Sequence, residues 1–178
     1  MGIDWKQNSD KIMAISATVT AVIALAVAVI EVRSEQEFQK LSVEPYIELG
    51  NSGGEPIGYY AFLLINNGLG PAIVKSGNFT VDGSPVGSWS EAVRTTTNDE
   101  SPFTNTYSAI TPNRRIKAAE TIEVFKITPY SDIAQSFHRV MNTERVEYEI
   151  CYCSIYDDCW RSSFAKQITH EPVAQCNI

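Results

Sequence analysis

The strongest pattern in the sequence is an uninterrupted apolar run near the N-terminus. The 19 residues from Ile12 to Ile30 include no charged side chain, and Lys11 and Arg33 bracket them. As a helix rising about 1.5 Å per residue, such a run spans roughly 28 Å, which matches the hydrocarbon core of a bilayer. A single segment crosses that core only as a helix, because its main-chain groups must be satisfied internally. The pattern therefore predicts a short tail over 1–11 and a transmembrane helix over 12–30.

Beyond this run, the pattern changes from helical to β-like. Residues 31–41 hold good helix formers and neither Gly nor Pro, so we expect the helix to continue to about residue 41. From residue 43 onward, short apolar and aromatic segments alternate with turns that contain Gly, Asn or Asp. This spacing predicts that residues 43–178 form a mainly β domain. The expected architecture is an antiparallel β-sandwich, immunoglobulin-like, with one short helix.

Within the domain, several segments can be assigned from the same pattern. Ser131 is the expected N-cap of the helix, and the connection Asn66–Pro71 is expected to need positive φ at its glycines. Residues 95–106 are polar, so we expect them to form a loop. The expected strands are 46–49, 58–65, 72–81, 116–117, 121–127, 145–155 and 160–168, the helix is 131–141, and residues 88–94 are compatible with a further short helix.

A cleaved signal peptide is the alternative interpretation of the apolar run. The run is longer than the apolar core of a usual signal peptide, and no small-x-small cleavage site follows it directly. We therefore expect an uncleaved anchor. Lys and Arg are balanced on the near flanks, so the positive-inside rule does not decide the orientation. Our expectation is a tail that stays inside the cell and a domain that is exported.

The charge of the domain limits its partners. The chain has a formal net charge of -7, and residues 41–178 hold ten Lys and Arg against sixteen Asp and Glu, a balance of -6. An acidic domain without a basic stripe repels both phosphate backbones and anionic lipid head groups. We therefore expect no nucleic-acid partner. The expected partners are the lipid bilayer around the helix and a second protein or another copy of the chain.

Small side chains recur along the expected membrane helix. A face of small side chains lets two helices approach closely within a membrane. In a run that contains this many alanines, such an alignment also arises by chance, and the alanines then simply face lipid. The pattern predicts packing in a homo-oligomer or against a partner helix, with lipid exposure as the alternative. The alanines that follow 3-4-3-4 spacing on one face are Ala14, Ala17, Ala21, Ala24 and Ala28.

All four cysteines lie in the last 28 residues: Cys151, Cys153, Cys159 and Cys176. A clustered, even set indicates disulfides or a metal site. We favour two disulfides in an oxidising periplasm, with Cys153–Cys159 and Cys151–Cys176 as one of three possible pairings. The alternatives are free thiols and a zinc site. Zinc fits less well, because structural zinc sites favour two C-x₂₋₄-C pairs and this chain has a single C-x-C. We expect no metal and no cofactor.

Several short blocks resemble a group of uncharacterised bacterial membrane proteins. The blocks are Leu41–Tyr46, Asn67–Ile73, the Asp82-Gly83 turn and Ile150–Trp160. In that group, an N-terminal membrane helix leads into a small β-sandwich. The resemblance implies a bacterial inner-membrane protein of the same architecture. It implies no activity, substrate or catalytic residue.

Catalytic chemistry has little support in the sequence. The histidines, His138 and His170, stand in no nucleophile motif, and no phosphate-binding loop, dinucleotide fingerprint or metal-binding helix occurs. We therefore expect a non-catalytic, single-pass inner-membrane protein whose exported sandwich binds another protein. Two alternatives stay open. One is a cytoplasm-facing, ligand-sensing effector of the phage-defence type that assembles through its membrane helix, and the other is an enzyme with an unrecognised site.

Overall fold

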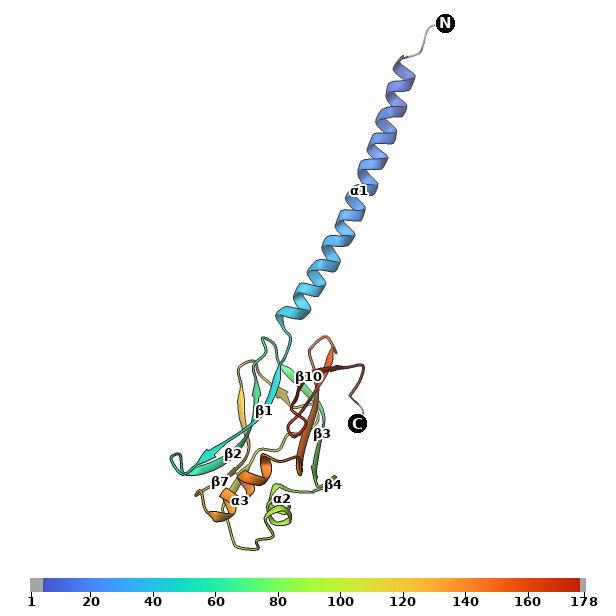
Figure 1. The fold of residues 1–178 in the computed structure, drawn as a ribbon. Helices are drawn as coiled ribbons and strands as arrows, with labels where there is room; N and C mark the ends of the chain where they lie inside the picture. The colour runs from blue at the N-terminus through green and yellow to red at the C-terminus, as the bar shows by residue number, and fades with distance from the viewer. Residues whose placement is uncertain (1–4, 177–178) are drawn as a thin grey trace. The chain divides into compact units, whose positions relative to one another are not determined.

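The computed structural model describes residues 5–176, with side chains from residue 12 onward (Figure 1). The chain divides into two compact units between Leu41 and Ser42. The first unit holds helix α1, Trp5–Ser42, apart from its last residue. This helix includes residues 5–11, expected as part of a tail, and it continues without a break beyond residue 30. Lys11, expected to bracket the apolar run, lies outside the described side chains.

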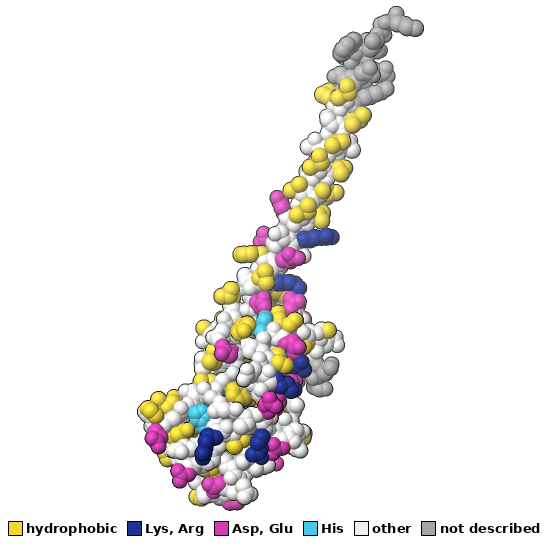
Figure 2. Space-filling model, viewed as in Figure 1, with side chains coloured by type: hydrophobic (Ala, Val, Ile, Leu, Met, Phe, Trp, Pro, Cys, Tyr) yellow, Lys and Arg dark blue, Asp and Glu magenta, His cyan; other side chains and the backbone are white. Residues whose placement is uncertain are grey.

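Helix α1 exposes apolar side chains over a membrane-length stretch (Figure 2). Its segment Ile12–Ser42 is long and apolar enough to cross a membrane. The large apolar side chains between residues 12 and 30 are each between 45 % and 67 % exposed. The hydroxyls of Ser16, Thr18 and Thr20 donate to carbonyls of the same helix at 2.9 Å each. Such a surface is unfavourable in water but suits lipid, where every hydroxyl must find its partner within the helix.

The second unit is built from antiparallel sheets. Its strands are β1 Ile47–Gly54, β2 Tyr59–Asn66, β3 Ala72–Val81, β4 Ser84–Pro85, β5 Asn105–Tyr107, β6 Arg115–Ile116, β7 Thr121–Ile127, β8 Val146–Cys153, β9 Cys159–Ser163 and β10 Ile168–Val173. One sheet has the order β1-β2-β7-β5, and the other has the order β10-β9-β8-β3-β4, with β6 paired to β3. The prediction of a mainly β, antiparallel domain behind a long N-terminal helix is confirmed.

The hydrophobic core lies between the sheets and is rich in aromatic rings. Trp89 stacks on Phe125, with ring centroids 4.9 Å apart and planes within 8°. Trp89 also lies 4.3 Å from the ring of Phe79. Of the aromatic residues expected as core or rim, Tyr60, Phe62, Phe125, Tyr148 and Tyr152 are buried, and Tyr59, Phe79 and Trp160 are partly buried. Stacked and edge-to-face rings of this kind stabilise a core beyond their area of burial.

Two short helices belong to the domain: the one expected, and a second one where residues 88–94 were compatible with a further helix. They are α2, Trp89–Thr97, and α3, Asp132–Met141, and they pack side by side at one end of the domain (Figure 1). The Ser88 hydroxyl caps α2 by accepting the Glu91 N–H at 3.1 Å. Ser131 is the N-cap of α3 as predicted, but its side chain makes no capping bond. The expected loop over 95–106 is shorter, because α2 and β5 occupy its ends.

The connection between β2 and β3 needs glycine for a reason that the sequence did not reveal. Neither Gly68 nor Gly70 has a positive φ, so that prediction is wrong. A Cβ at Gly70 would overlap the carbonyl of Val43, and one at Gly68 would overlap the carbonyl of Glu44. Residues 43–46 therefore lie directly against this connection, and only glycine leaves room for two backbones to approach so closely.

The buried side chain of Asn66 fixes this contact. Its Oδ1 accepts the N–H groups of Tyr46 at 3.1 Å and Gly68 at 3.0 Å. Its Nδ2 donates to the carbonyl of Gly70 at 2.8 Å and to the carbonyls of residues 116 and 117 at 3.2 and 3.1 Å. One amide thus joins three separate segments at the start of β1, and all of its hydrogen-bonding groups are satisfied, as a buried polar group requires.

The C-terminal region differs most from expectation. Strands β8 and β9 form the predicted hairpin, but the second strand ends at Ser163 and not at residue 168. A turn at residues 164–167 follows, and β10 then pairs with β9. A register shift in this pair accompanies a left-handed His170, with φ +59°. The turn was missed because its residues, Phe-Ala-Lys-Gln, include none of the usual turn formers.

Candidate functional site

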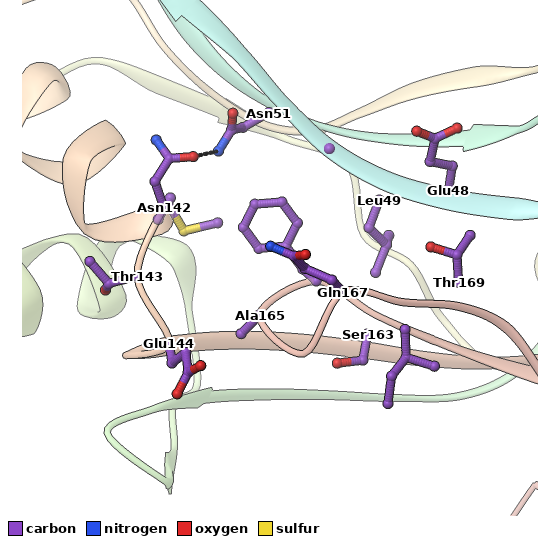
Figure 3. A pocket seen from close by; sticks show the side chains of 14 residues that line it. Glu48, Leu49, Asn51, Asn142, Thr143, Glu144, Ser163, Ala165, Gln167 and Thr169 are labelled. Atoms are coloured by element: carbon purple, nitrogen blue, oxygen red, sulfur yellow. Dashed lines mark hydrogen bonds between the residues drawn. The ribbon is translucent and has the colours of Figure 1, made fainter.

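A cleft of about 520 Å³ opens between the sheets on one side of the domain. Strand β1 forms one wall, the turn between β9 and β10 forms the other, and residues 141–144 at the end of α3 close one end. At this end, Asn51 Nδ2 donates to Asn142 Oδ1 at 3.2 Å (Figure 3). Glu48 and Thr169 lie at the opposite end (Figure 3). A volume of this size lies within the range of ordinary ligand pockets.

Strand β1 presents its free edge to this cleft. It is an edge strand of its sheet, and it pairs with β2 over its whole length. Just before β1, the N–H of Asn67 donates to the carbonyl of Tyr46 at 2.8 Å. Along an antiparallel pair, the main-chain groups of successive residues point alternately toward the partner strand and away from it. The N–H and C=O groups of Glu48 and of every second residue after it therefore hydrogen-bond to β2. The N–H and C=O groups of Leu49 and Asn51 therefore point away from β2, toward the cleft.

The first residue of β1 confirms this alternation. The N–H of Ile47 donates to Tyr152 Oη at 3.1 Å, and its carbonyl accepts from Ser162 Oγ at 2.7 Å. Both partners belong to the other sheet, Tyr152 to β8 and Ser162 to β9. The outer edge of β1 is thus joined to the second sheet at Ile47, and the cleft begins where these bonds end.

The lining of the cleft combines an apolar floor with an acidic rim. Met141 is only 1 % exposed, and Leu49 and Phe164 are partly buried, packing against the core. Glu48 and Glu144 are exposed. Among the described residues that line the cleft, these two are acidic and none is Lys or Arg. The cleft can therefore accept a chain segment that offers main-chain hydrogen bonds, apolar side chains and positive charge.

The structure joins all four cysteines in two disulfides, Cys151–Cys176 and Cys153–Cys159. This pairing is the one named above among three possibilities. One disulfide closes the β8–β9 hairpin, and the other ties the C-terminal segment to β8. The sulfur atoms of Cys153, Cys159 and Cys176 lie within 4.8 Å of one another, a spacing that a metal ion could bridge. Zinc binds thiolates, however, so the zinc alternative requires the disulfides to be reduced.

His170 lies at the centre of a hydrogen-bonded group at the start of the domain. Its Nε2 lies 2.5 Å from Glu44 Oε1, and its Nδ1 lies 3.0 Å from Tyr152 Oη. Burial raises the pKa of Tyr152, so this hydroxyl keeps its proton at neutral pH and can donate it to Nδ1. The imidazole packs between Trp160, stacked at 4.7 Å, and Tyr46, at 4.9 Å.

Both histidines are occupied by structural partners. The two ring nitrogens of His170 are engaged, and they link residue 44 to β8 and β10. His138 Nδ1 lies 3.0 Å from Tyr130 Oη, and burial lowers the pKa of His138. Neither histidine is among the residues that line the cleft. Among the described residues, the lining of the cleft thus includes no imidazole.

The alanines singled out for helix packing all lie on α1, and their side chains are exposed. Packing of this face against another helix stays a prediction. The residues concerned are Ala14, Ala17, Ala21, Ala24 and Ala28.

Sequence reasoning missed the cleft altogether. Its walls come from residues 48–51, 141–144 and 163–169, which are far apart in the chain and share no motif. The alternation at 46–49 indicated a strand, but nothing showed that this strand would be an edge. In comparisons with known proteins, neither a protein-family model nor a curated protein matches this sequence.

Proposed function

We propose that this protein is a non-catalytic, single-pass protein of a bacterial inner membrane, whose β-sandwich lies in the periplasm and binds another protein. The observation that carries the proposal is the pair of disulfides. Disulfides persist in oxidising compartments and are rare in the cytosol, so their presence supports export of the domain. Helix α1, long and apolar enough to cross a membrane, supplies the anchor.

Protein binding is supported by the free edge of β1 beside the cleft. Unpaired strand edges are sites where another chain can add its own main chain. The small-residue face of α1 supports a further association, either between copies of this chain or with the membrane helix of a partner. Both contacts together describe a component of a membrane complex, anchored by one helix and recognising its partner through the exported domain.

Thiol labelling in intact cells tests the location. Cells producing the full chain are treated with a membrane-impermeant maleimide, with and without prior reduction. We expect the wild-type protein to be labelled only after reduction, because its cysteines are paired and exported. Labelling that requires lysis but no reductant would place the domain in the cytosol, overturn the proposal and favour the ligand-sensing effector.

A fifth cysteine provides the control for orientation. Leu69 is 75 % exposed, so the Leu69→Cys variant carries an accessible thiol outside the disulfides. This variant should be labelled in intact cells without any reductant. If it were labelled only after lysis, the domain would face the cytosol whatever the state of the native cysteines. Protein binding is then tested by photocrosslinking from sites on several faces of the domain, and the absence of any cross-linked product would refute it.

A further inference from the structure

We propose that the cleft beside β1 is the docking site for an extended, positively charged segment of the partner protein, which adds to β1 as a new strand. This inference rests on the proposed function, because it names the chemistry of the partner that the domain binds. Recognition by strand addition takes its affinity from main-chain hydrogen bonds and its selectivity from pockets for alternate side chains. The cleft offers both.

The main-chain contribution comes from the outer edge of β1. The N–H and C=O groups of Leu49 and Asn51 point into the cleft, as the alternation from Tyr46 and Ile47 requires. An added strand would continue the row of bonds that Ile47 already makes to Tyr152 and Ser162. The added strand would thus occupy the cleft between the two sheets.

The side-chain contribution comes from the floor and the rim. Leu49 and Phe164, which pack on the buried Met141, provide an apolar surface for side chains on the inner face of an added strand. Glu48 and Glu144 lie at the rim, where side chains of the outer face would pass. Alternation of apolar and charged positions is the pattern of an extended strand with one buried face.

Charge decides the nature of the occupant. Within the described residues, the Glu48 carboxylate accepts a hydrogen bond only from the neutral Asn67 amide, at 2.8 Å. The nearby cation Lys166 is turned to Glu147, with Nζ 3.8 Å from Oε2, and it does not line the cleft. The rim is therefore acidic, and it attracts Lys or Arg side chains of an incoming segment.

A second copy of the domain is the less suitable occupant. Residues 41–178 carry a balance of -6, and pairing β1 with its own copy would bring two acidic rims together. Juxtaposed like charges disfavour such a contact. A basic segment from a different protein meets the opposite potential, so the electrostatics that oppose self-pairing favour this partner.

Peptide binding to the full chain in non-ionic detergent micelles tests the proposal. The probe is a fluorescein-labelled, eight-residue peptide of alternating lysine and valine, the length of β1, followed by fluorescence anisotropy. We expect saturable binding that the same peptide with glutamate for lysine does not show. The double variant Glu48→Lys with Glu144→Lys should weaken binding by about tenfold, since two attractive contacts become repulsive.

The matched control is Glu100→Lys with Asp157→Lys, an equal reversal of two charges at exposed positions outside the cleft lining. It should change the affinity less than about twofold, because screening limits its effect at that distance. Equal loss of affinity in both variants would mean attraction to the net charge alone, and it would overturn the proposed site. Failure of the lysine peptide to bind would overturn it as well.

Amide hydrogen exchange measured by NMR separates strand addition from simple contact. On addition of the peptide, the N–H groups of Leu49 and Asn51 should become protected, while those of Glu48 and Gly50, already bonded to β2, should change little. Binding without protection at Leu49 and Asn51 would refute strand addition. Concentration-dependent protection without peptide would identify a second copy as the occupant and refute a basic partner.

The proposed function can survive the failure of this inference. If photocrosslinking captures a partner from other faces of the domain but never from residues at the β1 edge, the domain binds a protein elsewhere and the cleft is not its site. If thiol labelling places the domain in the cytosol, the proposed function itself fails, whatever the peptide does.

Discussion

The two disulfides should contribute unequally to stability, because they close loops of different length. Cys151–Cys176 spans a sequence separation of 25, and Cys153–Cys159 spans a separation of 6. The loop-closure entropy of the unfolded chain then gives about 3.5 kcal/mol for the longer loop and about 2.2 kcal/mol for the shorter one. Because the shorter loop is nested within the longer one, the two contributions are not additive.

The longer disulfide has a second role in the folded state. It ties the segment after β10 to β8, and β10 carries His170, which bonds Glu44 and Tyr152. Cys151→Ala with Cys176→Ala should therefore loosen this hydrogen-bonded group as well as lengthen the free chain. Cys153→Ala with Cys159→Ala should leave it in place, because the hairpin is also held by the ladder between β8 and β9.

Guanidinium unfolding of the full chain in detergent, followed by tryptophan fluorescence and near-UV circular dichroism, measures the difference. We expect the Cys151/Cys176 variant to lose about 3.5 kcal/mol and the Cys153/Cys159 variant about 2.2 kcal/mol of unfolding free energy. Losses of this size are large against the 5–15 kcal/mol or so that is typical of a domain. An equal or larger loss from the shorter loop would refute the reasoning from loop length. Stabilities unchanged in both variants would show that the purified protein lacks the disulfides.

Three further predictions concern single side chains and use the same unfolding assay. Asn66→Ala leaves buried main-chain groups at three segments unpaired and should lower the free energy of unfolding by about 4 kcal/mol. Asn67→Ala removes only an exposed hydrogen bond and should lower it by about 0.5 kcal/mol. Similar losses in the two variants would contradict the role given to Asn66. Tyr60 Oη is buried without a partner in the described part of the chain, so Tyr60→Phe should stabilise the domain by about 1 kcal/mol, and a destabilised variant would show a missed hydrogen bond. Burial lowers the pKa of His138 in the folded state, so the unfolded chain binds a proton first and stability should fall as the pH drops below about 6.5. His138→Gln should flatten this dependence between pH 7.5 and 5.5, and an unchanged slope would refute it.

The long apolar helix and the fold class could be predicted from the sequence because each rests on local patterns. A run without charge from Ile12 to Ile30 has only one conformation that satisfies its main chain in lipid. Alternation of apolar residues and turn formers likewise indicates strands without knowledge of their neighbours. Disulfides among the clustered cysteines could be predicted for a related reason. Two cysteines on one strand share a face, and a nearby turn brings a third close to them.

The glycines at 68 and 70 show where local reasoning fails. Their residue type announced a special backbone, and positive φ was the local explanation. The actual reason is the carbonyls of Val43 and Glu44, which a chain separation of about 25 residues hides from any local pattern. The left-handed His170 and the strand β10 were missed likewise, because their bulged pairing with β9 follows a turn without turn-forming residues.

Only the tertiary structure decided which strand has a free edge and what lies beside it. Residues 46–49 read as a strand in the sequence, but edge or centre depends on which strands pair, and pairing is set by contacts across the whole domain. Tyr152 and Ser162 hold the sheets together at Ile47, and the cleft opens beside the residues of β1 that follow. Glu48 and Glu144 lie together on the acidic rim of the cleft, although nearly a hundred residues separate them in the chain. The sequence by itself thus determined the long apolar helix, the β architecture and the cysteine cluster, which are local properties, whereas the cleft is a property of long-range packing alone.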